Sequence, residues 1–260
     1  MATFLFDEII FGPVKSRRLG VSLGINLLPT KKKICNFDCI YCECGWTRDI
    51  EIPLSRLPSR EEVYNALDHK LSELRNKNHA PDVFTYAGNG EPTLHPEFPE
   101  IIDDTLELRN KYFPQARIAV LSNATTISNP LVKAALLKVD QNILKLDSAI
   151  DSTIRIHNQP RVKIKADELI ENLAGFNGKV IIQTLFLRGT HNGRPIDNTT
   201  PVEIKAWLKA IVKIKPSEVM IYTISRDTPE GAKLNKVPLT ELRKIASLVE
   251  SRGIRTQVSG

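Results

Sequence analysis

Four cysteines lie within ten residues of this 260-residue chain, and they are the only cysteines in it. Three of them, Cys35, Cys39 and Cys42, follow one another at intervals of four and three positions. Thiolates are the usual ligands of iron-sulfur clusters, which normally take four cysteines, so three cysteines leave one iron open to another molecule. The spacing therefore predicts a reactive cluster held by these three residues.

The residues alone also allow other roles for the four cysteines. Together with Cys44 the three cysteines can close a tetrahedral zinc site, although such sites usually pair two separated Cys-x-x-Cys segments and this sequence has one. A disulfide framework is disfavoured because a chain of this length buries a core without one. Cys44 is then a fourth ligand, a reactive thiol or simply a small side chain, and one spare cysteine cannot build a second cluster.

Glycine and polar residues follow two segments that are typical of buried strands. In a Gly-Asn-Gly-Glu-Pro stretch, Gly88 and Gly90 allow backbone to approach a ligand closely, and Glu91 can accept hydrogen bonds from an ammonium group. Ser122 and Asn123 follow the next such segment. Because the carboxyl ends of parallel strands meet at one edge of a sheet, these residues are expected to share a ligand site.

Lys145 and Asp147 are two positions apart in a further strand-like segment, so their side chains are expected on the same side of it. A buried unpaired lysine is costly, which predicts a partner or a ligand beside Lys145. The alternative is an ion pair between the two that only fills the protein interior.

Apolar runs alternate with amphipathic segments along the chain, which predicts repeated βα units around a mainly parallel sheet. The expected strands span residues 20–28, 83–87, 117–121, 142–146, 179–187 and 218–224, with a short edge strand at 254–258. The expected helices begin near Ser59 and continue at 96–112, 129–139, 167–176, 201–214 and 238–252. Ser59 and Glu62 form a capping-box pattern, and Gly178 is the expected stop of the fourth helix.

Six βα units predict an α/β fold of the partial TIM barrel type, (β/α)6, with ligands at the carboxyl ends of its strands. The length suits one domain over residues 1–260, with residues 1–19 as an N-terminal extension. No apolar stretch approaches the length of a membrane span, and the first ten residues lack the basic start of a signal peptide, which predicts a cytoplasmic protein.

The net charge of +6 and a pI near 9.1 favour acidic or polyanionic partners, with a solvated surface of mildly basic character as the alternative. A run of three lysines at 31–33 agrees with an RNA partner. Arg17 and Arg18 precede the first expected strand and are either polyanion contacts or structural ion-pair partners.

The cysteine segment CNFDCIYC, with Tyr41 before its third cysteine, resembles the motif of the radical S-adenosylmethionine (radical SAM) superfamily. The Gly-Asn-Gly-Glu-Pro stretch resembles the Gly-Gly-Glu-Pro motif of that family, with Asn89 in place of the first glycine. The stretch 11–24 and the residues that follow the second motif are similar to the compact branch related to wyosine-type tRNA synthases. These synthases use an additional cluster, for which this sequence has no cysteines.

The resemblance implies an oxidoreductase that uses a 4Fe-4S cluster and S-adenosylmethionine. Cys35, Cys39 and Cys42 would hold three irons, and the fourth would chelate the amino and carboxylate groups of S-adenosylmethionine. Reductive cleavage would yield a 5′-deoxyadenosyl radical that abstracts a substrate hydrogen. The family contacts to S-adenosylmethionine would fall on Tyr41 near adenine, Gly90 and Glu91 at the amino group, and Ser122, Asn123, Lys145 and Asp147 at the ribose or carboxylate.

Four polar residues in or just beyond the expected strands at 179–187 and 218–224 are the expected substrate contacts: Gln183, Arg188, Arg194 and Arg226. The expected partners are a reductant such as flavodoxin or ferredoxin and a tRNA or protein substrate, with tRNA modification as the first reading. A glycyl-radical-enzyme activase is the alternative enzyme. An iron-sulfur electron carrier or a zinc-binding interaction domain is the non-enzymatic alternative, but neither needs the carboxylate of Glu91.

Overall fold

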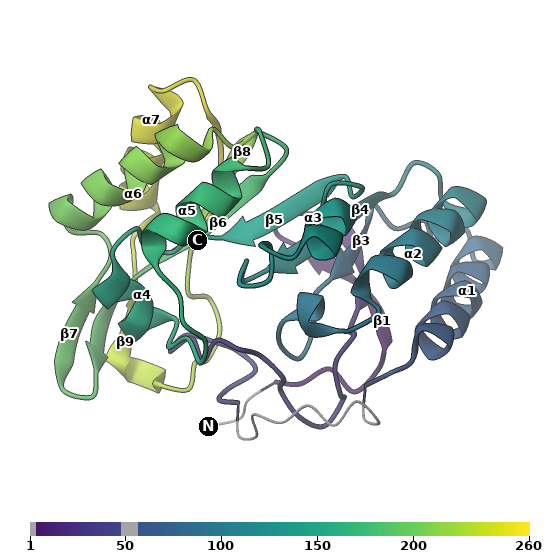
Figure 1. Ribbon diagram of the computed structural model, residues 1–260. Coiled ribbons are helices and arrows are strands. Elements are labelled where there is room, and N and C mark those ends of the chain that lie inside the picture. The colour runs from purple at the N-terminus through teal and green to yellow at the C-terminus, as the bar shows by residue number, and fades with distance from the viewer. Residues whose placement is uncertain (1–3, 48–56) are drawn as a thin grey trace.

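The computed structural model describes residues 4–47 and 57–260, which fold around one curved sheet (Figure 1). Its strands lie in the order β1-β2-β3-β4-β5-β6-β8-β10. Six strands form the predicted parallel series: β2 (Gly20–Ile25), β3 (Val83–Tyr86), β4 (Arg117–Ser122), β5 (Gln141–Lys145), β6 (Ile181–His191) and β8 (Glu218–Thr223). β10 (Arg255–Ser259) pairs in parallel with β8, so the expected edge strand is confirmed.

Helices follow the parallel strands and lie outside the curve of the sheet (Figure 1). They are α1 (Arg60–Asn76), α2 (Phe98–Tyr112), α3 (Pro130–Leu136), α4 (Asp151–His157), α5 (Ala166–Ala174), α6 (Pro201–Ile214) and α7 (Leu239–Glu250). A short 3-10 helix, η2 (Pro92–Leu94), follows β3, and another, η3 (Gly231–Lys233), precedes β9 (Leu234–Lys236). The α/β partial-barrel architecture predicted from the sequence is confirmed.

Helix α1 shows how local sequence sets an element. The side chain of Ser59 accepts a hydrogen bond from the backbone N–H of Glu62, and the carboxylate of Glu62 accepts one from the N–H of Ser59. This reciprocal capping box satisfies two donors that the first turn leaves without partners. The predicted apolar face is the buried one: Val63, Leu67, Leu71 and Leu74.

Alternation along the strands divides the interior into two regions. Side chains such as Phe84, Val120 and Leu144 point outward and pack with the helices in the main hydrophobic core. The neighbouring residues of the same strands point into the barrel. There a floor of Val83, Ala119, Ile143, Ile181 and Met220 closes one end, and smaller or polar residues lie above it.

Besides the two 3-10 helices, three strands and one α-helix of the described residues were not predicted, and each has a weak sequence signal. β1 (Ile10–Ser16) contains Pro13 and pairs antiparallel with β2 across a bulge between Phe11 and Val14, which is where an edge strand tolerates proline. It lies within the segment expected as an N-terminal extension. β7 (Arg194–Asp197) and β9 add short antiparallel pairs to an extended β6, and α4 has two turns only.

The predicted stop of α5 was wrong by three residues. The helix ends at Ala174 with Gly175 as its cap, and Gly178 follows with a positive φ of 84° in the turn toward β6. Among the described residues, no helix combines the length and apolar character that crossing a bilayer requires.

His157 ends α4 with a buried imidazole whose Nδ1 has no hydrogen-bond partner in the described chain. Burial lowers the pKa of His157 to about 4, against about 6.5 in an unfolded chain. The unfolded state therefore binds the proton first, so the stabilising contribution is complete above about pH 6.5 and is lost as the pH falls toward 4.

We expect His157 to account for a loss of about 2 kcal/mol of unfolding free energy in the apo protein between about pH 7.5 and about pH 5. Urea denaturation at the two pH values measures it. His157→Gln should remove this part of the pH dependence, whereas the same substitution at the exposed His69 should not. An identical pH dependence in the His157 variant and the wild-type protein would contradict the assignment.

Candidate functional site

The loop after β2 carries the four cysteines along the lower side of the barrel in Figure 1, where it faces the carboxyl ends of β3, β4 and β5. Cys39 is 7% exposed, and Cys35, Cys42 and Cys44 are partly buried. The loop is fixed to the barrel by an isolated parallel bridge between Ile34 and Gly90. The cysteine positions are therefore set by backbone hydrogen bonds rather than by the loop alone.

Side-chain amides from the end of β4 and from the end of α4 donate to the sulfurs of this loop. Nδ2 of Asn123 lies 3.6 Å from Sγ of Cys35, and Nδ2 of Asn158 lies 3.4 Å from Sγ of Cys39. Donors of this kind stabilise thiolate charge and help to set the potential of an iron-sulfur cluster. Asn158 was not predicted as a site residue, because its position after α4 has no sequence pattern.

Lys33 supplies a buried positive charge next to the same thiols. Its ammonium group donates to the carbonyl of Gly45 at 2.8 Å and to Oδ1 of Asp38 at 3.2 Å. Burial acts to lower the pKa of Lys33, but the charges of Cys42, Cys35 and Cys39 outweigh burial and raise it. The lysine run 31–33 was interpreted as agreeing with an RNA partner, but Lys33 is 4% exposed and its ammonium group contacts the cysteine loop instead.

The three thiols of the motif differ in their environments. Burial raises the pKa of Cys35 and of Cys39. A hydrogen bond from Cys44 lowers the pKa of Cys42, and the Lys33 charge acts in the same direction. The thiol of Cys44 also lies 3.5 Å from the carbonyl oxygen of Gly88. Cys44 therefore contacts both Cys42 and the glycine turn.

The Gly-Asn-Gly-Glu-Pro stretch turns tightly beneath the cysteine loop. Gly90 has a φ of 136°, and a Cβ atom there would lie 1.7 Å from the carbonyl oxygen of Ile34, so only glycine fits. Asn89, which replaces a glycine of the family motif, is fully buried. Its side chain accepts from the N–H of Phe6 at 2.8 Å and donates to the carbonyl of Phe6 at 2.8 Å, so it anchors the N-terminal segment to the turn.

Glu91 joins the ends of β3 and β4. One carboxylate oxygen accepts from the N–H and the hydroxyl of Thr93, at 3.1 and 2.6 Å. The other accepts from the N–H of Asn123 at 2.6 Å, and the hydroxyl of Ser122 also donates to this carboxylate. Burial raises the pKa of Glu91, while these donors act to lower it. The carboxylate therefore holds together the two strand ends that were predicted to share a ligand site.

A second polar group lies at the end of β5. Lys145 donates to the hydroxyl of Tyr41 at 2.9 Å and lies 3.5 Å from the carboxylate of Asp147. Asp147 also accepts from the hydroxyl of Tyr41, from Asn158 at 2.7 Å and from the N–H of Leu185 at 2.9 Å. Burial acts to lower the pKa of Lys145, but the charges of Asp147, Tyr222 and Cys39 together outweigh burial and raise the pKa.

The two polar groups meet through the cysteine loop. Asn123 connects Cys35 to the Glu91 group, and Asn158 connects Cys39 to Tyr41 and Asp147. All the residues predicted as contacts of the cluster and of S-adenosylmethionine thus lie in or directly beside one continuous network. Main-chain and side-chain donors, the carboxylates of Glu91 and Asp147, and three thiols occupy a common edge of the barrel.

The four predicted substrate residues have different locations. Gln183 is paired with Lys145 across neighbouring parallel strands, so its side chain faces the barrel interior, and Arg226 lines a cavity beside the cysteine loop. Arg188 is paired with Asp197 and Glu241 outside the barrel. Arg194 is exposed in β7 and lines a separate surface hollow. Only the first two lie on the side of the sheet that the cysteines face.

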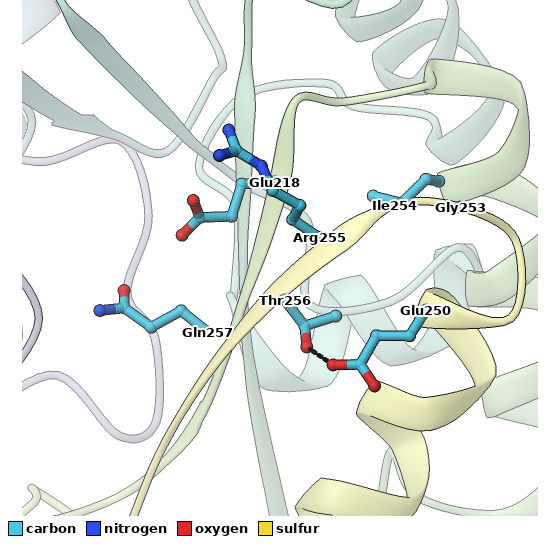
Figure 2. Close-up of a pocket in the computed structure, with 7 residues that line it drawn as sticks. All are labelled: Glu218, Glu250, Gly253, Ile254, Arg255, Thr256 and Gln257. Carbon is cyan, nitrogen blue, oxygen red and sulfur yellow. Dashed lines mark hydrogen bonds between the residues drawn. The ribbon is translucent and has the colours of Figure 1, made fainter.

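Another hollow lies at the amino ends of β8 and β10, on the side of the sheet opposite to the strand ends that the cysteines face (Figure 2). It has a volume of about 640 Å³ and includes Glu218 and Arg255, the first residues of β8 and β10. Glu250 accepts a hydrogen bond from the hydroxyl of Thr256 at its rim. Because ligands in such folds gather at the carboxyl ends of the strands, this hollow is not part of the site described above.

Residues 32–189 match the family model of the radical SAM superfamily, which is more than half of the chain. The chain therefore belongs to the radical SAM superfamily and is an enzyme that uses a 4Fe-4S cluster and S-adenosylmethionine. The family predicted from the cysteine spacing is confirmed.

Two curated relatives illustrate the range of this similarity. A GTPase Obg of Brachyspira hyodysenteriae is 30% identical over 90% of this chain, but the chain covers only 33% of that protein. A UPF0026 protein of Helicobacter pylori is 31% identical over 93% of this chain and 74% of its own length. The chain thus spans about a third of the first relative and about three quarters of the second.

Solved structures share the fold at low sequence identity. A radical SAM methyltransferase from Sphaerobacter thermophilus has a TM-score of 0.65 at 12% identity, over 92% of this chain and 65% of that one. SuiB of Streptococcus suis, bound to the precursor peptide SuiA, has a TM-score of 0.61 at 15% identity, over 91% and 48%. TYW1 with a lysine-pyruvate adduct has a TM-score of 0.57 at 14% identity, over 88% and 73%.

The residues of this chain fit an iron-sulfur cluster. Three thiols from one loop lie next to two amide donors and a buried lysine, which together favour thiolate ligands. Within residues 4–47 and 57–260, no three His, Cys, Asp or Glu side chains are grouped to hold a single metal ion. Cys35, Cys39 and Cys42 would hold the cluster, and Lys33, Asn123 and Asn158 would surround its sulfur ligands.

Proposed function

We propose that this radical SAM enzyme abstracts a hydrogen atom from an RNA substrate. Four basic side chains support this proposal: Lys15, Arg17, Arg18 and Arg226 line a cavity that also includes Glu43, the residue after the third motif cysteine. Cationic side chains attract the phosphates of a nucleic acid, and the net charge of +6 acts in the same direction. The similarity in fold to TYW1 agrees with an RNA substrate, but the proposal rests on the basic side chains of the cavity.

Within this proposal, residues at the ends of β3, β4 and β5 would hold S-adenosylmethionine, which would supply the substrate-oxidising radical on reductive cleavage. The backbone at Gly90 and the carboxylate of Glu91 would meet its amino group, and Ser122, Asn123, Lys145 and Asp147 would bind its ribose or carboxylate. Tyr41 would contact its adenine. A flavodoxin or ferredoxin is the proposed source of the electron.

The protein contributes orientation and exclusion of water to this chemistry. Asn123 and Asn158 hold two thiols in fixed positions, and Glu91 fixes the turn that carries Gly90. The buried pair of Lys145 and Asp147 keeps charged groups away from water at the end of β5. Side chains that are held rigidly in this way favour one reacting geometry of substrate and cofactor.

We expect cells that lack the protein to lose one modified nucleoside, which mass spectrometry of digested RNA detects. Expression of the wild-type chain should restore the nucleoside, and expression of Cys42→Ala should not. RNA affinity of the purified protein should fall steeply with added salt because phosphate contacts dominate. An unchanged nucleoside profile, together with salt-insensitive binding of a polypeptide, would instead favour the glycyl-radical-enzyme activase.

A further inference from the structure

The cavity beside the cysteine loop has a volume of about 780 Å³ and lies between β1, the inner faces of β2 to β4 and the loop after β8. Ser22, Thr85 and Ala87 leave room for it because their side chains are small. The hydroxyl groups of Ser22 and Thr85 hydrogen bond to each other at 2.7 Å on this inner surface. The barrel thus contains a space for a ligand in addition to the residues predicted for S-adenosylmethionine.

Arg18 lines this cavity and a smaller one of about 80 Å³ that Tyr41 also lines. Its guanidinium group lies 4.5 Å from the centre of the Tyr222 ring. Its Nη1 atom is buried and has no hydrogen-bond partner in the described part of the chain. A buried donor without an acceptor is costly, so a turn of the guanidinium group that brings this nitrogen to an acceptor on a ligand is favoured.

Two other basic side chains of the cavity, Arg17 and Arg226, already form hydrogen bonds within the protein. Arg17 donates to the carbonyl of Gly260 at 2.8 Å and to the hydroxyl of Ser225 at 2.6 Å. Arg226 donates to Glu43 at 2.7 Å. Of the residues that the structure describes, four basic side chains nevertheless line the cavity against two acidic ones, Glu43 and Asp227. The excess positive charge and the free guanidinium nitrogen of Arg18 suit a phosphate group.

Aromatic rings also line the cavity. The rings of Phe6 and Phe11 stack with centroids 3.7 Å apart and planes inclined by 22°, and Phe4 meets Phe6 edge-on at 4.9 Å. The Phe11 ring covers Gly24 and occupies the place where any side chain there would lie. Because Asn89 holds the backbone of Phe6, the aromatic wall is tied to the glycine turn of the active site.

We propose that this cavity binds one nucleotide unit of the substrate, with its phosphate on Arg18 and its base against Phe6 and Phe11. Aromatic rings stack on bases of any sequence, and arginine binds phosphate through a forked pair of donors. This inference rests on the proposed RNA substrate and identifies the residues that would select it. Arg18 binds the anion, and the phenylalanines bind the planar group.

Binding of uridine 5′-monophosphate and of uridine to the full-length apo protein tests the proposal, because neither probe contains adenine. Calorimetry should give a weaker affinity for uridine than for its phosphate in the wild-type protein. Arg18→Gln should weaken binding of the phosphate by about tenfold and leave uridine binding unchanged. Phe11→Leu should weaken binding of both probes, because it removes the stacked ring.

Arg252→Gln serves as the matched control, since Arg252 is exposed at the far end of α7. Thermal unfolding of each variant separates lost binding from lost folding, and Arg18→Lys keeps the charge if Arg18→Gln is unstable. Equal loss of uridine and its phosphate in Arg18→Gln would overturn the phosphate assignment. Failure of the wild-type protein to bind both the mononucleotide and a five-nucleotide single-stranded RNA would overturn the cavity proposal.

The outcomes also separate this inference from the proposed function. Arg18-dependent binding of the short RNA but not of the mononucleotide identifies an RNA chain as the source of the nucleotide. Arg18-dependent binding of the mononucleotide with no change of RNA modification in cells supports the cavity and rejects RNA as the substrate. Loss of a modified nucleoside in cells, with no nucleotide binding in the cavity, rejects the cavity alone.

Discussion

Cys39→Ala is expected to abolish assembly of the iron-sulfur cluster and the reductive cleavage of S-adenosylmethionine. Cys39 is the buried thiol of the motif, at 7% exposure, and its sulfur accepts a hydrogen bond from Asn158. Alanine offers no ligand, and a cluster with two remaining thiolates lacks the protein ligands that hold it. The wild-type protein should bind about four iron and four sulfide per chain after anaerobic reconstitution.

Iron and sulfide analysis and chromatography of 5′-deoxyadenosine measure the two effects. Cys44→Ala is the matched control, because it removes a thiol from the same loop without removing a motif cysteine. We expect this control to keep a cluster, with at most a change in the environment of Cys42. Cleavage by Cys39→Ala at the wild-type rate would reject the ligand role of Cys39.

Asp147→Ala is expected to produce the largest loss of folding stability of the variants considered. The side chain of Asp147 is fully buried and accepts hydrogen bonds from Tyr41, Asn158 and Leu185 besides its contact with Lys145. Its removal leaves the Lys145 ammonium buried without its carboxylate. Breaking a buried pair in this way costs about 3–5 kcal/mol, measurable by urea denaturation of the apo protein.

The exposed pair of Lys138 and Asp103 provides the control, with side chains that are 45% and 52% exposed. Asp103→Ala should cost less than about 1 kcal/mol because solvent screens the pair. A double variant, Lys145→Met with Asp147→Leu, should recover part of the stability lost in Asp147→Ala, since it removes the unpaired charge. Equal costs for Asp147→Ala and Asp103→Ala would show that the buried contact adds no stability.

Most helices and strands could be predicted from the sequence, because the capping and periodicity patterns that specify them extend over only a few residues. Helix α6 begins at Pro201 and ends at Ile214, as predicted, and α1 begins at its predicted capping box. The strands β3 and β8 were predicted to within one residue of their observed ends. In contrast, β7 and β9 depend on pairing with an extended β6, which no short stretch of sequence reveals.

The residues of the candidate site also divide into those that the sequence predicted and those that it did not. The spacing of Cys35, Cys39 and Cys42 identified the family, since cluster ligands from one loop are close in sequence. Asn158 was missed because it is 119 residues from Cys39 in the chain and meets it only through folding. The burial of Lys33 was also missed, because a lysine within a basic run looks like a surface residue.

The sequence by itself determined the cysteine loop, the glycine turn, the alternating βα units and hence the enzyme class, because each depends on the order of neighbouring residues. The tertiary structure alone decided that Glu91 bridges two strand ends and that Asn158 reaches both Cys39 and Asp147. It also decided that Arg18 has a buried nitrogen with no partner among residues 4–47 and 57–260. These contacts depend on the curvature of the sheet and on side-chain burial, which bring distant segments together and cannot be read from spacing along the chain.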